Sequence, residues 1–230
     1  MQEKIEKVDS CIANLIKKEE ERQLKGLVMI PSENFASPAV LTALSSKLTN
    51  KYSEGYPYHR YYSGNKYIDQ IELIAQERAK SLFKADFANV QPHSGTQANM
   101  ACYFALLKPK DKILAMNLKA GGHLSHGSPV SFSGNLFHFI HYGVEAKTNL
   151  IDYNQIEKLT KKYKPKMIIS GASSYPRKIN FKYISQIAHK YGAYHLADIA
   201  HIAGLIVAGL HPSPFPFADL VTSTTQKTLR

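Results

Sequence analysis

The stretch MIISGASSYPRKINFKYISQIAHKYGAYHLAD (167–198) decides the fold class. MIIS (167–170) is a short apolar strand, residues 183–191 have the spacing of a helix that stops at Gly192, and AYHLAD (193–198) is a second strand. Strands that alternate with helices predict an α/β protein with a parallel sheet covered by helices on both faces.

The same alternation extends in both directions along the chain. Further strands are expected at FANV (87–90), ILAM (113–116), LFHFIHY (136–142) and DLVTST (219–224). Further helices are expected over 71–82, 96–107 and 156–163. An amphipathic helix near the start, with its end near Gly26, and a long irregular Tyr-rich segment (31–67) precede them. We therefore expect a helical arm (1–30) and a large domain (31–230).

The composition is that of a globular protein rather than a disordered or membrane-spanning one. The 230 residues are 44% hydrophobic and 20% charged, and no apolar run is long enough to cross a membrane or serve as a signal peptide. Two cysteines are too few for a disulfide framework, which favours a cytoplasmic location. The net charge is +11, and the lysines within 158–166 are read as a solvated face rather than a nucleic-acid site.

Two polar turns are candidates for ligand binding. Ser94, Gly95 and Thr96 open a helix, where hydroxyls and backbone amides would bind a phosphate, although the P-loop and dinucleotide glycine patterns are absent. The same residues are compatible with an ordinary helix N-cap. His123 and His126 lie in a Gly-rich loop, but no third ligand follows at metal spacing, so no metal site is predicted.

Two further candidates stand at the ends of apolar strands, where open α/β sheets bind ligands. Asp198 is followed three residues later by His201, a spacing that also fits a metal pair or an N-cap. Lys227 lies among threonines after the last strand, where partial burial would lower its pKa and make it a nucleophile; the alternative is an ordinary surface lysine. Ser173 offers a hydroxyl beyond the strand MIIS.

The order of these groups is more informative than any one of them. A phosphate turn, a histidine in a Gly-rich loop, a strand-end carboxylate and a strand-end lysine are what pyridoxal 5'-phosphate requires. With them the sequence resembles the serine hydroxymethyltransferase family, enzymes of the aspartate-aminotransferase-like fold. The segments that carry the resemblance are PSENF (31–35), LTNKYSEGYP (48–57), RYYSGN (60–65), NVQPHSGTQAN (89–99), GGHLSHGSPVSFSG (121–134), PKMIISGASSYPR (165–177), DIAHIAGL (198–205) and STTQKTLR (223–230).

The resemblance implies interconversion of serine and glycine with tetrahydrofolate as co-substrate, in a homodimer or higher oligomer. It implies that the cofactor is held by Ser94, Gly95, Thr96, His123, Ser173, Asp198, His201, Gln226 and Lys227. The catalytic residues it implies are Lys227, Glu54, Tyr62, Thr224 and His123. It assigns the amino-acid substrate to Ser32, Tyr52, Glu54 and Tyr62, and the folate to Leu118, Gly122, His123 and Leu124. Lys227 would join the cofactor, and Tyr52 and Glu54 would reach the neighbouring subunit's site.

Three departures from the family pattern accompany the resemblance. Gln226 replaces the usual His beside Lys227, and Pro31 replaces a usual Ala. The family continues beyond Arg230 with Gly-Pro-Arg-Gly-Gly and a small C-terminal domain, so 31–230 is expected to be an incomplete large domain. Two alternatives stay open: a threonine-aldolase-like lyase of the same cofactor class, or an inactive fragment that binds the cofactor or dimerises.

Overall fold

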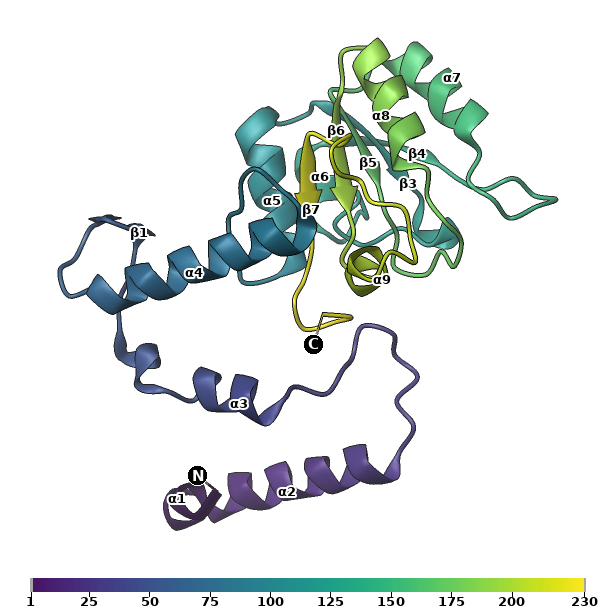
Figure 1. Cartoon of the computed structure of the whole chain (residues 1–230). Helices are drawn as coiled ribbons and strands as arrows, with labels where there is room; N and C mark the ends of the chain where they lie inside the picture. Colours follow the sequence, from purple (N-terminus) through teal and green to yellow (C-terminus); the bar gives the residue numbers. More distant parts are fainter. Residues whose placement is uncertain (1, 230) are drawn as a thin grey trace. The chain divides into compact units, whose positions relative to one another are not determined.

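The computed structural model describes the backbone of residues 2–229 and the side chains of residues 5–229. The chain forms two compact units, one that ends at Glu33 and one that begins at Asn34 (Figure 1). Each unit is described by itself below.

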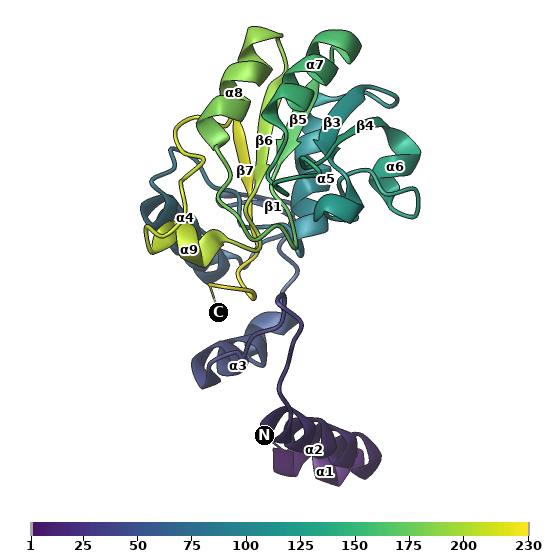
Figure 2. The ribbon, with the colours of Figure 1, turned by 90° about the vertical axis from the view of Figure 1, so that its right-hand side faces the viewer.

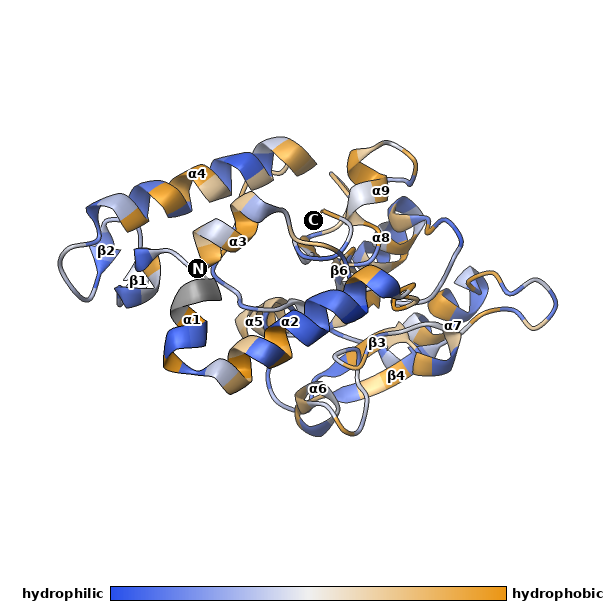
Figure 3. Ribbon diagram, turned by 90° about the horizontal axis from the view of Figure 1, so that it is seen from below, coloured by the Kyte–Doolittle hydropathy of each residue, from blue (hydrophilic) through white to orange (hydrophobic). Residues whose placement is uncertain are grey.

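The first unit holds two helices, α1 (Gln2–Val8) and α2 (Ser10–Lys25). The prediction of a single amphipathic helix was wrong, because the helix is interrupted at Asp9. That residue has extended backbone, and its carboxylate accepts a hydrogen bond from the Ile12 amide at 3.0 Å, so it caps α2 and interrupts the helix. Apolar and polar residues alternate along α2 (Figure 3), and Leu15 is 54% exposed.

The Tyr-rich segment is more ordered than the sequence indicates. It contains α3 (Pro38–Leu44), a 3₁₀ turn η1 (Lys47–Asn50), and two short antiparallel strands, β1 (Gly55–Tyr56) and β2 (His59–Arg60). Ser37 accepts a hydrogen bond from the Val40 amide and Pro38 occupies the first turn, both readable helix-start signals. Residues 52–62 are called the tyrosine hairpin below.

A parallel sheet of five strands forms the centre of the second unit, with the order β4-β3-β5-β6-β7. Its strands are β3 (Lys112–Met116), β4 (His138–Tyr142), β5 (Met167–Ser170), β6 (Tyr194–Asp198) and β7 (Leu220–Thr222). The helices around it are α4 (Lys66–Phe83), α5 (Gly95–Leu106), α6 (Phe132–Leu136), α7 (Tyr153–Tyr163), α8 (Phe181–Lys190) and α9 (Ala203–Val207), with the 3₁₀ turn η2 (Leu118–Ala120). The predicted α/β fold class is confirmed.

Alternate residues of the strands supply two separate cores. Leu114 and Ile168 pack with α7 and α8 on one face, whereas Ile113 and Ile169 pack with Tyr103 of α5 on the other. Figure 2 shows α7 and α8 on one side of the sheet and α5 on the other. Because a strand directs successive side chains to opposite faces, the central strand β5 is buried along its whole length by the two cores.

Most predicted elements are present, with three differences. FANV (87–90) is not a strand, because no strand among residues 2–229 pairs with it, and Phe87 is 91% exposed. Leu136 belongs to the short helix α6 rather than to the strand that follows. The short helix α9 was not predicted from the sequence. No helix in the described chain is long and apolar enough to span a membrane.

Candidate active site

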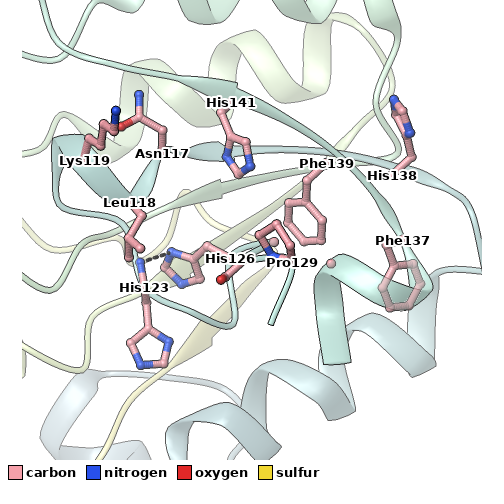
Figure 4. Close-up of a pocket in the computed structure, with 13 residues that line it drawn as sticks. Asn117, Leu118, Lys119, His123, His126, Pro129, Phe137, His138, Phe139 and His141 are labelled. Carbon is pink, nitrogen blue, oxygen red and sulfur yellow. Dashed lines mark hydrogen bonds between the residues drawn. The ribbon is translucent and has the colours of Figure 1, made fainter. Parts of the chain in front are cut away.

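Two adjoining cavities lie beside the carboxyl ends of the central strands. The smaller one, of about 190 Å³, is lined by Ser94, Gly95, Thr96, His123, His126, Ala172, Ser173, Asp198, Ala200, His201, Thr224, Gln226 and Lys227. The larger one, of about 620 Å³, is lined by Asn117, Leu118, Lys119, His123, His126, Gly127, Ser128, Pro129, Gly134, Phe137, His138, Phe139 and His141 (Figure 4). His123 and His126 line both cavities, so these two histidines separate them.

Asp198, the last residue of β6, is buried and held by three donors. Its Oδ2 lies 2.9 Å from His126 Nε2 and accepts a hydrogen bond of 2.9 Å from Asn99 Nδ2. Its Oδ1 accepts the backbone N–H of Ala200 at 3.2 Å. The carboxylate is therefore fixed in orientation by groups from α5, the Gly-rich loop and the turn after β6.

The His126 ring has one tautomer that satisfies all its contacts. Its Nδ1 accepts the backbone N–H of His123 at 3.3 Å (Figure 4), so Nδ1 carries no proton. The proton then lies on Nε2, which donates to Asp198. A neutral imidazole is enough to make both contacts.

Burial and hydrogen bonding oppose each other at Asp198. Burial raises the pKa of the carboxyl group, but the hydrogen bond from His126 and those from Asn99 and the Ala200 amide outweigh it. The pKa of Asp198 is therefore held well below its ordinary value. A fixed anion in this cavity can pair with a cation or a protonated ring nitrogen.

Asn99 connects three parts of the site. Its Nδ2 also donates to Ser125 Oγ at 2.9 Å, and its Oδ1 accepts from Thr222 Oγ1 at 2.7 Å. Ser125 Oγ in turn lies 2.8 Å from His123 Nδ1. One fully buried amide on α5 thus holds the end of β7, the Gly-rich loop and the strand-end carboxylate in register.

The turn at Ser94–Thr96 has the features of an anion site. Ser94 Oγ accepts the amide of Gln97 at 3.1 Å and caps α5, while Gly95 and Thr96 line the cavity. A Cβ at Gly95 would stand 2.9 Å from Thr224 Cγ2, so only glycine keeps this space open. Thr224 Oγ1 is buried in the same cavity without a hydrogen-bond partner in the described part of the chain.

Lys227 and His201 line the same cavity as this turn. Partial burial lowers the pKa of the Lys227 amine, an effect that the charge of Asp198 partly offsets. Burial likewise lowers the pKa of His201, and the neighbouring Lys227 lowers it further. Asn34 Nδ2 donates to the Lys227 carbonyl at 2.7 Å, and the adjacent Thr228 Oγ1 accepts the Gly204 amide at 2.8 Å. The lysine therefore stands on an anchored backbone, and Gln226 lies beside it.

Two loops meet at Ser173. Its backbone N–H donates to the Gly121 carbonyl at 2.7 Å. Gly171 has a φ of +116°, and a Cβ there would come within 1.9 Å of the Asp198 carbonyl oxygen. This close approach, which only glycine permits, brings the turn that carries Ser173 against the end of β6.

The residues expected to hold folate are only partly together. Leu118 and His123 line the larger cavity, whereas Gly122 and Leu124 are not among its lining residues. In Figure 4 the ring of His123 points away from His141. Burial and the nearby His126 lower the pKa of His123.

The residues expected to touch the amino-acid substrate lie elsewhere in the chain. Tyr52, Glu54 and Tyr62 belong to the tyrosine hairpin and line neither cavity; the rings of Tyr52 and Tyr62 meet edge to face at 6.2 Å. Ser32 lies in the first unit. Their functional roles therefore stay predictions.

Sequence reasoning missed Asn99 and assigned no role to His126. Both are fully buried polar residues that contact Asp198 directly. Asn99 could have been found from its spacing, since it follows Gly95 by four residues and so lies on the same face of α5. The role of His126 depends on the path of the Gly-rich loop, for which the sequence carries no comparable signal.

Comparison with known proteins gives one consistent family. A family model described as serine hydroxymethyltransferase matches residues 5–230. A curated serine hydroxymethyltransferase of Coprothermobacter proteolyticus is 59% identical over 226 residues, covering 98% of this chain and 54% of the relative. One of Methanosarcina barkeri is 59% identical over 226 residues, covering 98% of this chain and 55% of the relative. The chain thus spans about half the length of the curated relatives it matches.

Proposed function

The chain belongs to the serine hydroxymethyltransferase family, and from this we propose that its protein uses pyridoxal 5'-phosphate to interconvert serine and glycine with tetrahydrofolate. The observation that carries the proposal is the smaller cavity, which combines an anion turn, a buried carboxylate and a lysine of lowered pKa. Such a set of groups suits a cofactor with a phosphate, a basic ring and an aldehyde.

The residues present fit this cofactor. Thr224 Oγ1, buried and without a partner among the described residues, is a donor that a phosphate or substrate oxygen would satisfy. We assign the phosphate to Ser94, Gly95 and Thr96, and the ring nitrogen to Asp198, whose Oδ1 has a single donor among the described residues. Ser173, His201 and Gln226 line the same cavity and would complete the site with His123.

When bound, the cofactor supplies a protonated ring that withdraws electrons from the amino acid's α-carbon. Asp198 keeps the ring nitrogen protonated, because its own pKa is held low and it stays an anion. Lys227 supplies the amine that binds the aldehyde; its lowered pKa raises the fraction of neutral amine at a given pH. His126 and Asn99 keep the carboxylate from rotating.

We place the folate co-substrate in the larger cavity. Phe137, Phe139 and Pro129 offer it apolar walls, and Leu118 and His123 were already expected to contact it. Since His123 lines both cavities, a folate there would lie next to the amino acid. Glu54 would act as acid and base near the hydroxymethyl group, and Ser32, Tyr52 and Tyr62 would bind the substrate, with Tyr52 and Glu54 supplied by a partner copy in a homodimer.

Reductive trapping tests the proposal directly. The purified protein is incubated with the cofactor, reduced with borohydride, digested and mapped by mass spectrometry. We expect the reduced adduct on Lys227, a visible absorption band that changes when glycine is added, and serine turnover that requires tetrahydrofolate. Lys119, which lines the other cavity, serves as the comparison residue. An adduct elsewhere, or threonine cleavage with no folate-dependent serine turnover, would overturn the proposal.

A further inference from the structure

A buried ion cluster holds the tyrosine hairpin. The Arg60 side chain is 4% exposed, and its guanidinium donates to Asp69 Oδ1 at 2.8 Å and to Glu72 Oε2 at 2.7 Å, both on α4. Its Nη1 donates at 2.8 Å to the carbonyls of Ser53 and Gly55. These two carbonyls belong to the residues on either side of Glu54.

The Tyr58 backbone N–H of the hairpin also donates to Asp69 Oδ2 at 3.1 Å, and Gln91 adds two contacts from a different part of the chain. Its Nε2 donates to the Gly55 carbonyl at 2.9 Å and to Glu72 Oε1 at 2.7 Å. The cluster has two carboxylates for one guanidinium, so the second oxygen of Glu72 has a neutral amide rather than a cation as its donor. One side-chain amide therefore joins the hairpin backbone to α4.

The backbone of Gln91 leads directly to the anion turn. Its N–H donates to Asn89 Oδ1 at 3.0 Å, which shapes the local turn. Ser94, three residues later, is the N-cap of α5. The Glu54 carbonyl accepts the Tyr61 amide at 3.2 Å, so the peptide groups around Glu54 are held at each end and in the middle. The Glu54 side chain is exposed, and it projects from a backbone that these hydrogen bonds hold in place.

We propose that Gln91 is a positioning residue that sets the tyrosine hairpin, and with it Glu54, in register with the Ser94–Thr96 turn. The inference rests on the proposed function only for the role of Glu54. Gln91 is the informative position because Arg60 neutralises buried carboxylates, and its removal would leave them without a counter-charge. Removal of Gln91 leaves that ion pairing and the Tyr58 N–H contact to Asp69 in place, and it cuts only the link between the hairpin and the segment that precedes the Ser94–Thr96 turn.

Hydrogen exchange of the cofactor-free protein tests the connection without any activity measurement. In Gln91→Met we expect amides of residues 53–61 to exchange about fivefold faster than in the parent protein. Gln155→Met is the matched control, because Gln155 also uses its amide on a backbone group, the Gly143 N–H at 2.7 Å, away from the hairpin. Equal exchange in the two variants would overturn the proposal.

Kinetics then tests the consequence for Glu54. Gln91→Met should lower kcat for folate-dependent serine cleavage about tenfold or more, since small misplacements of a reacting group are costly. The KM for serine should rise as well, because Tyr52 and Tyr62 belong to the same hairpin, whereas the cofactor absorption should stay within about twofold of the parent value. An unchanged kcat, with a loss of thermal stability equal to that of Gln155→Met, would show a merely structural role and refute the proposal.

Two further outcomes separate this inference from the proposed function. A parent protein without folate-dependent turnover would refute the proposed function, while hydrogen exchange would still decide whether Gln91 holds the hairpin. If Gln91→Met does not fold, Gln91→Asn keeps an amide that is one methylene too short to reach both acceptors. Faster exchange over residues 53–61 in that variant supports the proposal, and parental exchange refutes it.

Discussion

His126 Nε2 donates a hydrogen bond of 2.9 Å to Asp198 Oδ2, although the two residues are 72 positions apart in the chain. The imidazole is 1% exposed, and its other nitrogen accepts a backbone N–H, so the ring can turn neither toward solvent nor over. The strand-end carboxylate is thus held as an anion by a residue of the Gly-rich loop.

Replacement of His126 should weaken cofactor retention. In His126→Phe the carboxylate loses one of its three donors, and its pKa should rise toward the ordinary range, so it would hold a protonated ring less well. We expect cofactor affinity to fall about tenfold, as for the loss of a charge-assisted hydrogen bond. Equilibrium dialysis measures it, with His138→Phe at the exposed start of β4 as control. Equal affinities for both variants would contradict this role.

The lowered pKa of Lys227 gives a second prediction. Since burial favours the neutral amine, Lys227 of the cofactor-free protein should react with an amine-specific reagent at a lower pH than an ordinary lysine side chain does. The charge of Asp198 acts in the opposite sense, so Asp198→Asn should shift the titration of Lys227 lower still. Competitive labelling against pH, read by mass spectrometry, measures both shifts. An upward shift in Asp198→Asn would be inconsistent with the geometry.

The sequence predicts the elements better than the contacts between them. Apolar strands and crossover helices are local patterns, which is why β3, β5 and β6 were found within one residue of their bounds. Asp198 was identifiable because strand ends in α/β sheets gather at one edge. Its side-chain partners do not stand at strand ends: Asn99 is readable only from its helical spacing to Gly95, and His126 lies on a loop whose path is set by tertiary packing.

Errors occurred where local signals were read without their tertiary context. FANV (87–90) has strand composition but no neighbouring strand in the described chain to pair with. Asp9 was read as one polar position of a continuous helix, although it caps a new one. Ser37 and Pro38 carried a readable helix start inside a segment that was expected to be irregular.

The buried His195 should make the protein less stable to unfolding in acid. Burial lowers its pKa to about 3, with its ring between the Ser170 hydroxyl at 2.7 Å and the Ser185 hydroxyl at 2.5 Å. An unfolded histidine titrates near about 6.5. Between these values the unfolded state binds a proton that the folded state does not. The contribution of His195 to the free energy of unfolding is therefore fully present above about pH 6.5 and is lost as the pH drops toward 3.

Urea unfolding at several pH values checks this linkage. One such group contributes a slope of about 1.4 kcal/mol per pH unit inside the window. His195→Leu should remove that slope, while it costs about 1–3 kcal/mol at pH 7 because two buried hydroxyls lose their partner. If the variant and the parent protein lose stability in parallel between pH 6 and 4, another group is responsible.

Gly171 gives the sharpest test of how the site is assembled. A methyl group there would meet the Asp198 carbonyl oxygen at 1.9 Å, so Gly171→Ala must push the turn that carries Ser173 away from β6. Gly192→Ala is the matched control, since Gly192 also has a positive φ, of +71°, but nothing lies within 4 Å of its added Cβ. In the control the free energy of unfolding should fall by only about 1–2 kcal/mol, which is the cost of a left-handed backbone conformation for alanine. Gly171→Ala should lose more stability and bind the cofactor at least about tenfold more weakly. Equal thermal shifts and equal cofactor affinities in the two variants would mean that the close approach of the turn to Asp198 does not determine the geometry of the site.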